Sequence, residues 1–415
     1  MKKYKKLLVV LLALIISVSP FTISGCANSE NDAHTPSSSE IVNPTDPNTS
    51  GSGSGEENEQ SNPNGQDTPA SDKVLFYFES DATKLHTDLQ LAYLADTYDS
   101  VAKYANGTNE KSKPVPATIK WQTNGKATNC ELKISEDESF NNFSTISVKS
   151  NIIEIYNLKA NTRYYYTLSA TVKGKTATST VQTFVTSSVV PRFIDCDGIT
   201  NMRDLGGYSV RGGEIKQGLI YRCGRLNQSD TNVVKPIITA KGIETMRRLG
   251  IKTEIDLRMD KVYSDGASET GRLNASLIGE DVNYYNCPMD VMAGVSNSIN
   301  YGSIRQVFAY LADENNYPLI FHCTIGTDRT GFIAYLLSGV LGVEKEGLLR
   351  DYLFSNFGNI GESRSESSIS DLYVKMLDNQ VGATLSEKIE NYLVNTVGVQ
   401  QEQIAAIRAI LITTR

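Results

Sequence analysis

Histidine and tryptophan are scarce in this sequence of 415 residues, which holds three His and one Trp. Its six Cys form no Cys-x-x-Cys pair and have no His at zinc-site spacing, so neither a metal site nor a cofactor is expected. A basic excess is also missing, because the formal net charge is −7. Nucleic acid is therefore not an expected partner, since proteins that bind it gather Lys and Arg on one face.

The charges are unevenly placed along the chain. Residues 1–26 carry four Lys and no acid, and an apolar stretch, Leu7–Ser19, follows these Lys residues. A positive start and a short apolar run are typical of an export signal. The run ends in Ile23–Cys26, which resembles a bacterial lipobox, and this resemblance implies that the Cys26 thiol carries a lipid. We therefore predict a lipoprotein signal peptide over 1–26 and an extracytoplasmic protein anchored to the cell membrane.

Residues 27–72 have a composition that cannot form a core. They contain nine Asp or Glu, no Lys or Arg, no aromatic residue and five Pro. Such a polar segment cannot bury enough apolar surface to offset its ordering entropy, so we predict a disordered acidic linker. Subtracting the charges of residues 1–72 leaves about −2 for residues 73–415, so the rest of the chain is nearly neutral.

Residues 73–188 contain short runs of alternating polarity broken by Asn and Gly, which predict a small all-β sandwich. The expected strands are 74–78, 117–121, 131–134, 152–155, 164–168 and 181–185, and a short helix is expected near 85–93. The segment Leu158–Tyr166 resembles the tyrosine corner of fibronectin type III domains, and Trp121 fits their core Trp. One difference is Ala160, which stands where Pro is usual.

Three consecutive tyrosines in this region have two interpretations. Alternation along a strand would bury Tyr164 and Tyr166 in the core, and we favour this over an exposed ligand platform. The whole domain is expected to act as a spacer or as a binding module for a cell-wall or host ligand.

Residues 190–415 alternate between helix and strand patterns, which indicates an α/β domain. Helices are expected at 239–249, 303–312 and 332–341, and strands at 253–257 and 319–322. Between the last strand and the last helix lies His322–Gly331, which reads HCTIGTDRTG. A strand, a tight loop and a helix present backbone N–H groups and the positive end of a helix to an anion.

The loop combines a nucleophile with a phosphate-binding residue. Cys323 is expected to attack phosphorus as a thiolate, and the fork of Arg329 to bind two phosphate oxygens. Gly326 permits the bend, Thr330 can donate to the sulfur, and His322 is expected to support the loop from a buried position. The predicted phosphate-binding residues are Thr324, Ile325, Gly326, Thr327, Asp328, Arg329 and Thr330.

These residues resemble the cysteine-dependent tyrosine phosphatases of bacteria and fungi, the family that includes the secreted mycobacterial tyrosine/lipid phosphatase. Further matching segments are Asn201–Gly207, Leu219–Leu226, Ile255–Arg258, Asp351–Leu353 and a pattern from Tyr392 to Arg408. The resemblance implies an α/β phosphatase domain that forms a phosphocysteine without metal. The chain departs from the family pattern at Thr327, where Lys is frequent, and at Cys223, where Ser is usual.

The leaving group also needs a proton donor. Trp121 is the single Trp and lies in the β domain, so the chain has no Trp-Pro-Asp loop. Two candidates remain for the acid, Asp328 in the loop and Asp256 at a strand end, and we favour Asp328. An alternative role for Asp256 is an ion pair with Arg258 or Arg329. For Arg203 and Asp204 we favour a turn-stabilising pair over direct catalysis.

The residues leave three functions open. The first is a protein-tyrosine or dual-specificity phosphatase acting on a phosphorylated protein or a small phosphoester. The second is a phosphoinositide or inositol-polyphosphate phosphatase, against which the missing Lys and the nearly neutral domain count. The third is a catalytically inert binding protein, which the intact Cys323, Asp328 and Arg329 oppose.

Overall fold

The computed structural model describes residues 73–81, 83–95, 113–228, 234–259, 273–358, 360, 363–369 and 375–414. The signal peptide, Cys26 and the linker 27–72 lie outside this range and stay predictions. Within it, no helix has both the length and the apolar character needed to cross a membrane. Residues Pro69–Arg415 form one compact unit.

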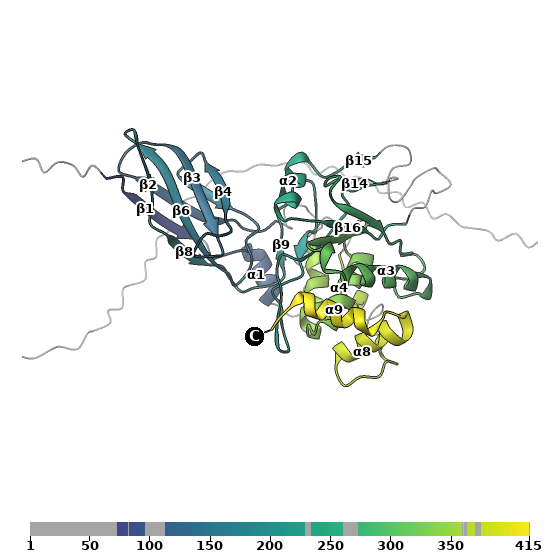
Figure 1. Cartoon of the computed structure of the whole chain (residues 1–415). Helices are drawn as coiled ribbons and strands as arrows, with labels where there is room; N and C mark the ends of the chain where they lie inside the picture. Colours follow the sequence, from purple (N-terminus) through teal and green to yellow (C-terminus); the bar gives the residue numbers. More distant parts are fainter. Residues whose placement is uncertain are drawn as a thin grey trace, which may run out of the picture. The chain divides into compact units, whose positions relative to one another are not determined.

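The first part of this unit consists of two antiparallel sheets, which we call the β module (Figure 1). One sheet has three strands in the order β1 (Phe76–Asp81), β2 (Ala117–Thr123) and β5 (Ile152–Ile155). The other has β4 (Ser144–Val148), β3 (Ala127–Ser135), β6 (Arg163–Val172) and β7 (Lys175–Thr178), with β8 (Gln182–Val185) also paired to β6. All six expected strands are present. Strands β4 and β7 were not expected, because they are short and largely polar.

Both sheets of the β module contribute to one hydrophobic core. Trp121 from β2 and Leu132 from β3 belong to it, as do Tyr164 and Tyr166 from β6, which are 5% and 2% exposed. Alternation along β6 therefore buries these two tyrosines, as predicted. The hydroxyl of Tyr164 accepts a hydrogen bond from the backbone N–H of Lys159 at 2.8 Å, which fixes the turn before β6.

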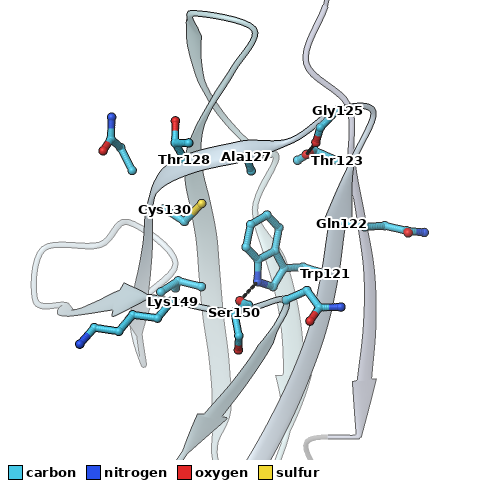
Figure 2. Close-up of a pocket in the computed structure, with 12 residues that line it drawn as sticks. Trp121, Gln122, Thr123, Gly125, Ala127, Thr128, Cys130, Lys149 and Ser150 are labelled. Carbon is cyan, nitrogen blue, oxygen red and sulfur yellow. Dashed lines mark hydrogen bonds between the residues drawn. The ribbon is translucent and has the colours of Figure 1, made fainter.

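A cavity of about 550 Å³ opens in the β module (Figure 2). All its lining residues lie between Trp121 and Asn151. Figure 2 shows the indole of Trp121 within it, and the indole N–H donates to the backbone oxygen of Ser150 at 2.9 Å. Cys130 and Lys149 also line this space, which thus mixes an aromatic ring with polar groups.

The second part of the unit is built on a six-stranded sheet. Its order is β17 (Asn283–Asn286), β16 (Thr253–Asp256), β18 (Leu319–His322), β13 (Ile220–Cys223), β10 (Arg203–Asp204) and β9 (Arg192–Phe193). The first four strands run parallel, and β10 and β9 are antiparallel to their neighbours. Smaller sheets contain β11 (Ser209–Val210), β12 (Gly213–Ile215) and β19 (Ile412–Thr414), and β14 (Asn227–Gln228) with β15 (Lys235–Pro236).

Several helices accompany this sheet in the described part of the chain. They are α2 (Ala240–Arg248), α3 (Tyr301–Leu311), α4 (Asp328–Val340), α5 (Lys345–Phe354), α6 (Glu366–Ile369), α7 (Lys375–Leu377), α8 (Leu385–Asn391) and α9 (Gln401–Leu411). Short 3-10 helices span Ser298–Asn300, Glu314–Asn316 and Ser355–Phe357, and a π-helix spans Tyr392–Val397. The expected helices and strands of this region are thus confirmed. Helix α4 begins at Asp328, four residues before its expected start.

Alternation along β18 separates two cores. Leu319 and Phe321 pack with α3, α4, α5 and α9, whereas Ile320 packs with Met246 of α2. Figure 1 agrees, because α2 lies on one side of β16 and α3, α4 and α9 lie on the other. This part is therefore an α/β domain, as predicted, and its sheet has helices on both faces.

The register of the parallel strands brings chemically important residues to one edge. His322 at the end of β18 is level with Asp256 at the end of β16 and with Cys223 at the end of β13. Ligands in open α/β sheets bind at the carboxyl ends of strands, so we expect the functional site at this edge.

Polar contacts and one helix join the β module to the α/β domain. Helix α1 (Asp88–Ala95) forms in the expected region, and its Tyr93 and Leu94 belong to the core beneath α4. The carboxamide of Gln217 accepts from the Ala160 N–H and donates to the Ala160 carbonyl, both at 2.8 Å. A proline at position 160 would lack this N–H, so alanine permits a hydrogen bond to Gln217 that proline would not.

We predict that Ala160→Pro lowers the free energy of unfolding by about 1 kcal/mol, because it removes one of the two bonds to Gln217. Urea unfolding of wild type and variant measures this change. In a Gln217→Leu background the same substitution should cost less, since the acceptor is already gone. An equal cost in both backgrounds would assign the effect to backbone strain.

Candidate active site

Cys323 lies at the start of a tight loop between the central strand β18 and helix α4. Its side chain is 2% exposed, and the loop of residues 323–327 ends where α4 begins at Asp328. Asp328, Arg329 and Thr330 therefore occupy the first turn of a 13-residue helix, whose free N–H groups favour an anion. We call residues 323–327 the Cys323 loop.

Three donors outside the Cys323 loop hold its carbonyl groups. The backbone N–H of Arg225 donates to the carbonyl of Thr324 at 3.2 Å. The Asn201 side chain donates to the carbonyl of Ile325 at 3.1 Å. The Arg222 guanidinium donates to the carbonyl of Gly326 at 2.6 Å.

Because these carbonyl groups point out of the loop, the directions of its N–H groups are also fixed. The C=O and N–H of one trans peptide point in opposite directions. The N–H groups of Ile325, Gly326 and Thr327 therefore point away from the three donors, toward the space that the loop encloses. Converging N–H groups of this kind make a cradle for an oxyanion.

Glycine is required at the bend for two reasons. Gly326 has a φ of +73°, in the left-handed region that other residues rarely adopt. A Cβ at this position would also lie 2.4 Å from the carbonyl oxygen of Cys223. That oxygen belongs to backbone of the neighbouring strand β13, so it cannot move aside.

Two of the three residues that donate to the loop carbonyls, Asn201 and Arg222, belong to a buried cluster around Asp351. Asp351 of α5 accepts from Arg203 Nε at 3.0 Å and from Arg222 Nη1. Arg203 also donates to the side chains of Asn201 and, at 3.2 Å, Ser355. One carboxylate thereby fixes Arg222 directly and Asn201 through Arg203, and both of these hold loop carbonyls.

The ionisation of this cluster follows from its partners. Burial alone would raise the pKa of Asp351, but Arg203 and Arg222 outweigh burial and hold that pKa below its usual value. Burial is also the main reason that the pKa of Arg203 falls to about 10. Asp351 and Arg203 are thus charged at neutral pH.

Arg203 and Asp204 do not form the expected turn-stabilising pair. Arg203 is bound to Asp351, whereas Asp204 accepts from Arg192 at 2.7 Å. Asp204 also accepts from the backbone N–H groups of Gly206 at 2.8 Å and Gly218 at 2.7 Å, so it does stabilise the local turns. Adjacent residues of a strand point to opposite faces of a sheet, so the side chains of Arg203 and Asp204 have different neighbours.

Arg329 lies against the Cys323 loop and is 4% exposed. It donates to the Thr324 hydroxyl at 3.1 Å and to the carbonyl of Met289 at 3.4 Å. The Thr330 hydroxyl is buried and has no hydrogen-bond partner in the described part of the chain. The expected bond from Thr330 to the Cys323 sulfur is therefore not formed in this structure.

His322 is fully buried, as predicted. Its Nε2 lies 2.9 Å from Glu254 Oε1, and its backbone oxygen accepts from Leu257 at 2.8 Å. Ser276 donates to the other oxygen of Glu254 at 2.5 Å. The imidazole is thereby fixed between β18 and β16.

Asp256 is fully buried and bound to Arg258. The Arg258 Nη2 donates to Asp256 Oδ2 at 2.6 Å, and Tyr284 donates to the same oxygen at 2.9 Å. Burial alone would raise the pKa of Asp256, but His322 and Arg258 outweigh it and lower the pKa below its usual value. The carboxylate is therefore ionised and fully engaged.

Asp328 has a different environment at the start of α4, and its side chain is 27% exposed. Arg364 donates to it from Nε and from Nη2, both at 3.2 Å. The Asn356 side chain holds the backbone of Arg364 in turn, by accepting from its N–H at 2.7 Å and donating to its carbonyl at 2.9 Å.

Cys223 and the other thiols complete the site region. The five described cysteines, Cys130, Cys196, Cys223, Cys287 and Cys323, are all free. Burial raises the pKa of Cys223 well above its usual value, so this thiol stays neutral. Among the described residues, no group of three or more His, Cys, Asp or Glu is arranged to hold a metal ion.

Sequence reasoning found the loop but missed most of its support. It assigned no role to Asn201, Arg222 or Asp351, although all three lie in segments that carry the family resemblance. Arg364 and Asn356 had no signal at all. A charged residue inside an otherwise apolar strand, such as Arg222 in β13, is the clue that was available.

We predict that Gly326→Ala lowers the free energy of unfolding by at least about 1 kcal/mol more than Gly212→Ala does. Gly212 is a matched control, because its φ is +86° but a Cβ added there would meet nothing within 4 Å. Urea unfolding measures both changes. Equal losses would mean that the contact with Cys223 relaxes and that only the backbone angle matters.

The tyrosine phosphatase family matches residues 194–413. A Cupriavidus necator protein named as a tyrosine-protein phosphatase is 31% identical over 39% of this chain and 63% of its own length. A tyrosine-protein phosphatase of Nostoc commune is 36% identical over 31% of this chain and 48% of its own.

Two further likenesses are more limited. The triple specificity protein phosphatase PtpB of Mycobacterium tuberculosis is 30% identical over 22% of this chain and 32% of its own length. The core catalytic domain of a PP-IP phosphatase from S. cerevisiae is 17% identical, with a TM-score of 0.23 over 50% of this chain and 91% of that domain. This chain spans less than two thirds of each of the three sequence relatives. The match over residues 194–413 covers more than half of the chain, which therefore belongs to the tyrosine phosphatase family, a family of cysteine-dependent enzymes.

Proposed function

We propose that the protein hydrolyses phosphomonoesters through a phosphocysteine intermediate formed on Cys323. The observation that carries this proposal is the Cys323 loop, whose carbonyls at 324, 325 and 326 are all held from outside. Its N–H groups and Arg329 then surround a site for a phosphate group next to the sulfur. Preorganised donors of this kind stabilise the charge that develops in the transition state.

The proposed reaction has two steps. The Cys323 thiolate attacks phosphorus, so that a P–S bond forms while the bond to the leaving oxygen breaks, and Asp328 gives its proton to that oxygen. Water then attacks the phosphocysteine and the P–S bond breaks. Asp328 takes a proton from this water, and inorganic phosphate and the thiolate are released. Arg329 binds the phosphoryl oxygens through both steps.

Asp328 suits the role of acid better than Asp256 does. A proton donor must reach the leaving group and must hold a proton before it reacts. Asp256 is fully buried, so it cannot reach the oxygen of a leaving group. Asp328 is partly exposed on the first turn of α4, beside Arg329. We therefore assign Asp256 to the ion pair and Asp328 to proton transfer.

Phosphotyrosine is the substrate class that we place first. The relatives are named as tyrosine-protein phosphatases, and one is named as a triple specificity protein phosphatase. Phosphoinositides are the alternative, but Thr327 offers no charge to them. Its side chain is buried, and its hydroxyl accepts from Asn201 at 3.3 Å. Initial rates on phosphotyrosine and phosphoserine peptides, phosphoinositides and phytate rank these substrates.

The location and the β module add two further proposals. The positive start, the apolar run and Cys26 support a lipid-anchored protein outside the cell membrane. The two antiparallel sheets and the Tyr164 hydroxyl bond support a fibronectin type III-like module. Its cavity beside Trp121 is of a size that binds small ligands, so a wall or host ligand would bind there.

We predict that Cys323→Ser lowers turnover to below about one per cent while phosphate still binds, because the amide cradle and Arg329 remain. Steady-state rates and phosphate titration measure the two properties. Turnover close to that of wild type would rule out Cys323 as the nucleophile and remove the basis of the proposed function.

We predict that Asp328→Asn lowers kcat by about 10²–10⁴-fold on aryl or alkyl phosphates with poor leaving groups, since proton transfer is lost. The loss should shrink on phosphates with good leaving groups, which depart without a proton. Asp256→Asn is the comparison variant and should show no such dependence. The opposite pattern would exchange the roles of the two residues.

A further inference from the structure

Arg364 binds Asp328, the proposed acid, through two hydrogen bonds. Its Nε and Nη2 lie 3.2 Å from the two oxygens of Asp328, and its side chain is 13% exposed. A guanidinium that binds a carboxylate at two points fixes the plane of the carboxylate as well as its position. The Asp328 side chain lies at the start of α4 and is 27% exposed, and this two-point contact constrains its direction.

The backbone that carries Arg364 is itself fixed. The Asn356 carboxamide bonds both the N–H and the carbonyl of Arg364, at 2.7 and 2.9 Å. Asn356 is fully buried, so this pair of hydrogen bonds is shielded from competing water. Arg364 therefore reaches Asp328 from an anchored point.

The anchor belongs to a segment that also supports the phosphate cradle. Asn356 lies in the 3-10 helix Ser355–Phe357, directly after α5, and α5 carries Asp351. Aromatic packing holds this segment, because the rings of Tyr93 in α1 and Phe357 meet edge to face with centroids 5.1 Å apart. Residues 351–357 thus support the cradle through Asp351 and the acid through Asn356.

We propose that Arg364 is a positioning residue for proton transfer by Asp328, and that Asn356 holds it in place. This inference rests on the proposed function. When Asp328 has given its proton away, the resulting carboxylate gains a paired cation, and the fixed plane directs one oxygen at the water that attacks next. Arg364 donates to both oxygens of the proposed acid, so its effect on kcat should be larger for leaving groups that need a proton.

The test compares two aryl phosphates that differ in leaving group. Phenyl phosphate needs a proton on its leaving oxygen, whereas p-nitrophenyl phosphate has a good leaving group. We expect Arg364→Met to lower kcat on phenyl phosphate by about 10–100-fold, the scale of a misplaced catalytic group. On p-nitrophenyl phosphate the loss should stay below about threefold, and KM should change little on either substrate.

Matched variants separate positioning from general damage. Arg211 is an exposed arginine between β11 and β12, and Arg211→Met should leave both rates unchanged. Arg364→Lys keeps the charge but loses the fork, so it should recover part of the rate on phenyl phosphate. Asn356→Ala should reproduce the leaving-group dependence of Arg364→Met, and the double variant should lose little more than either single variant.

The possible outcomes are distinct. Equal losses on the two substrates, no loss, or a higher kcat on phenyl phosphate in Arg364→Met would each overturn the proposal. Wild type that hydrolyses neither substrate, nor a phosphotyrosine peptide, would overturn the proposed function instead. Wild type with activity that Cys323→Ser lacks keeps the proposed function, and the leaving-group comparison then decides the role of Arg364.

Discussion

The site depends on the direction in which three carbonyl groups point. A loop of five residues between a strand and a helix has no regular hydrogen-bond pattern of its own, so something else must hold its peptide planes. Here Arg225, Asn201 and Arg222 bind the carbonyls of the Cys323 loop from outside. Loss of one of these bonds would let a peptide plane turn and place a carbonyl where an anion has to bind, which is electrostatically unfavourable.

This arrangement requires charged side chains in the interior of the protein, which are unfavourable there unless they are paired. Arg203 and Arg222 are fully buried, and they are stable there because Asp351 pairs with both. Removing one member of such a cluster leaves a buried charge unpaired, which costs several kcal/mol. The same α5 segment leads to Asn356 and packs against Tyr93 of α1. Helix α1, which follows strand β1, is therefore part of the support of the site.

Local patterns made the core of the site predictable. The run His322–Gly331 lies within one strand, loop and helix, so its chemistry could be derived from neighbouring residues alone. The strand ends at Asp256 and the burial of Tyr164 and Tyr166 also followed from short periodic runs. The support could not be derived in this way, because Arg203 and Asp351 are 148 residues apart in the chain and Asn201 is 124 residues from Ile325. Contacts over such separations depend on the tertiary fold.

The central claim is that Cys323, at the base of this cradle, becomes covalently phosphorylated during turnover. The most direct measurement is to denature the wild-type protein while it hydrolyses a phosphotyrosine peptide, and to locate the phosphoryl group by peptide mass spectrometry. The account predicts a phosphoryl group on the peptide that contains Cys323. Continued turnover with a phosphoryl group on another residue, or on none, would contradict it.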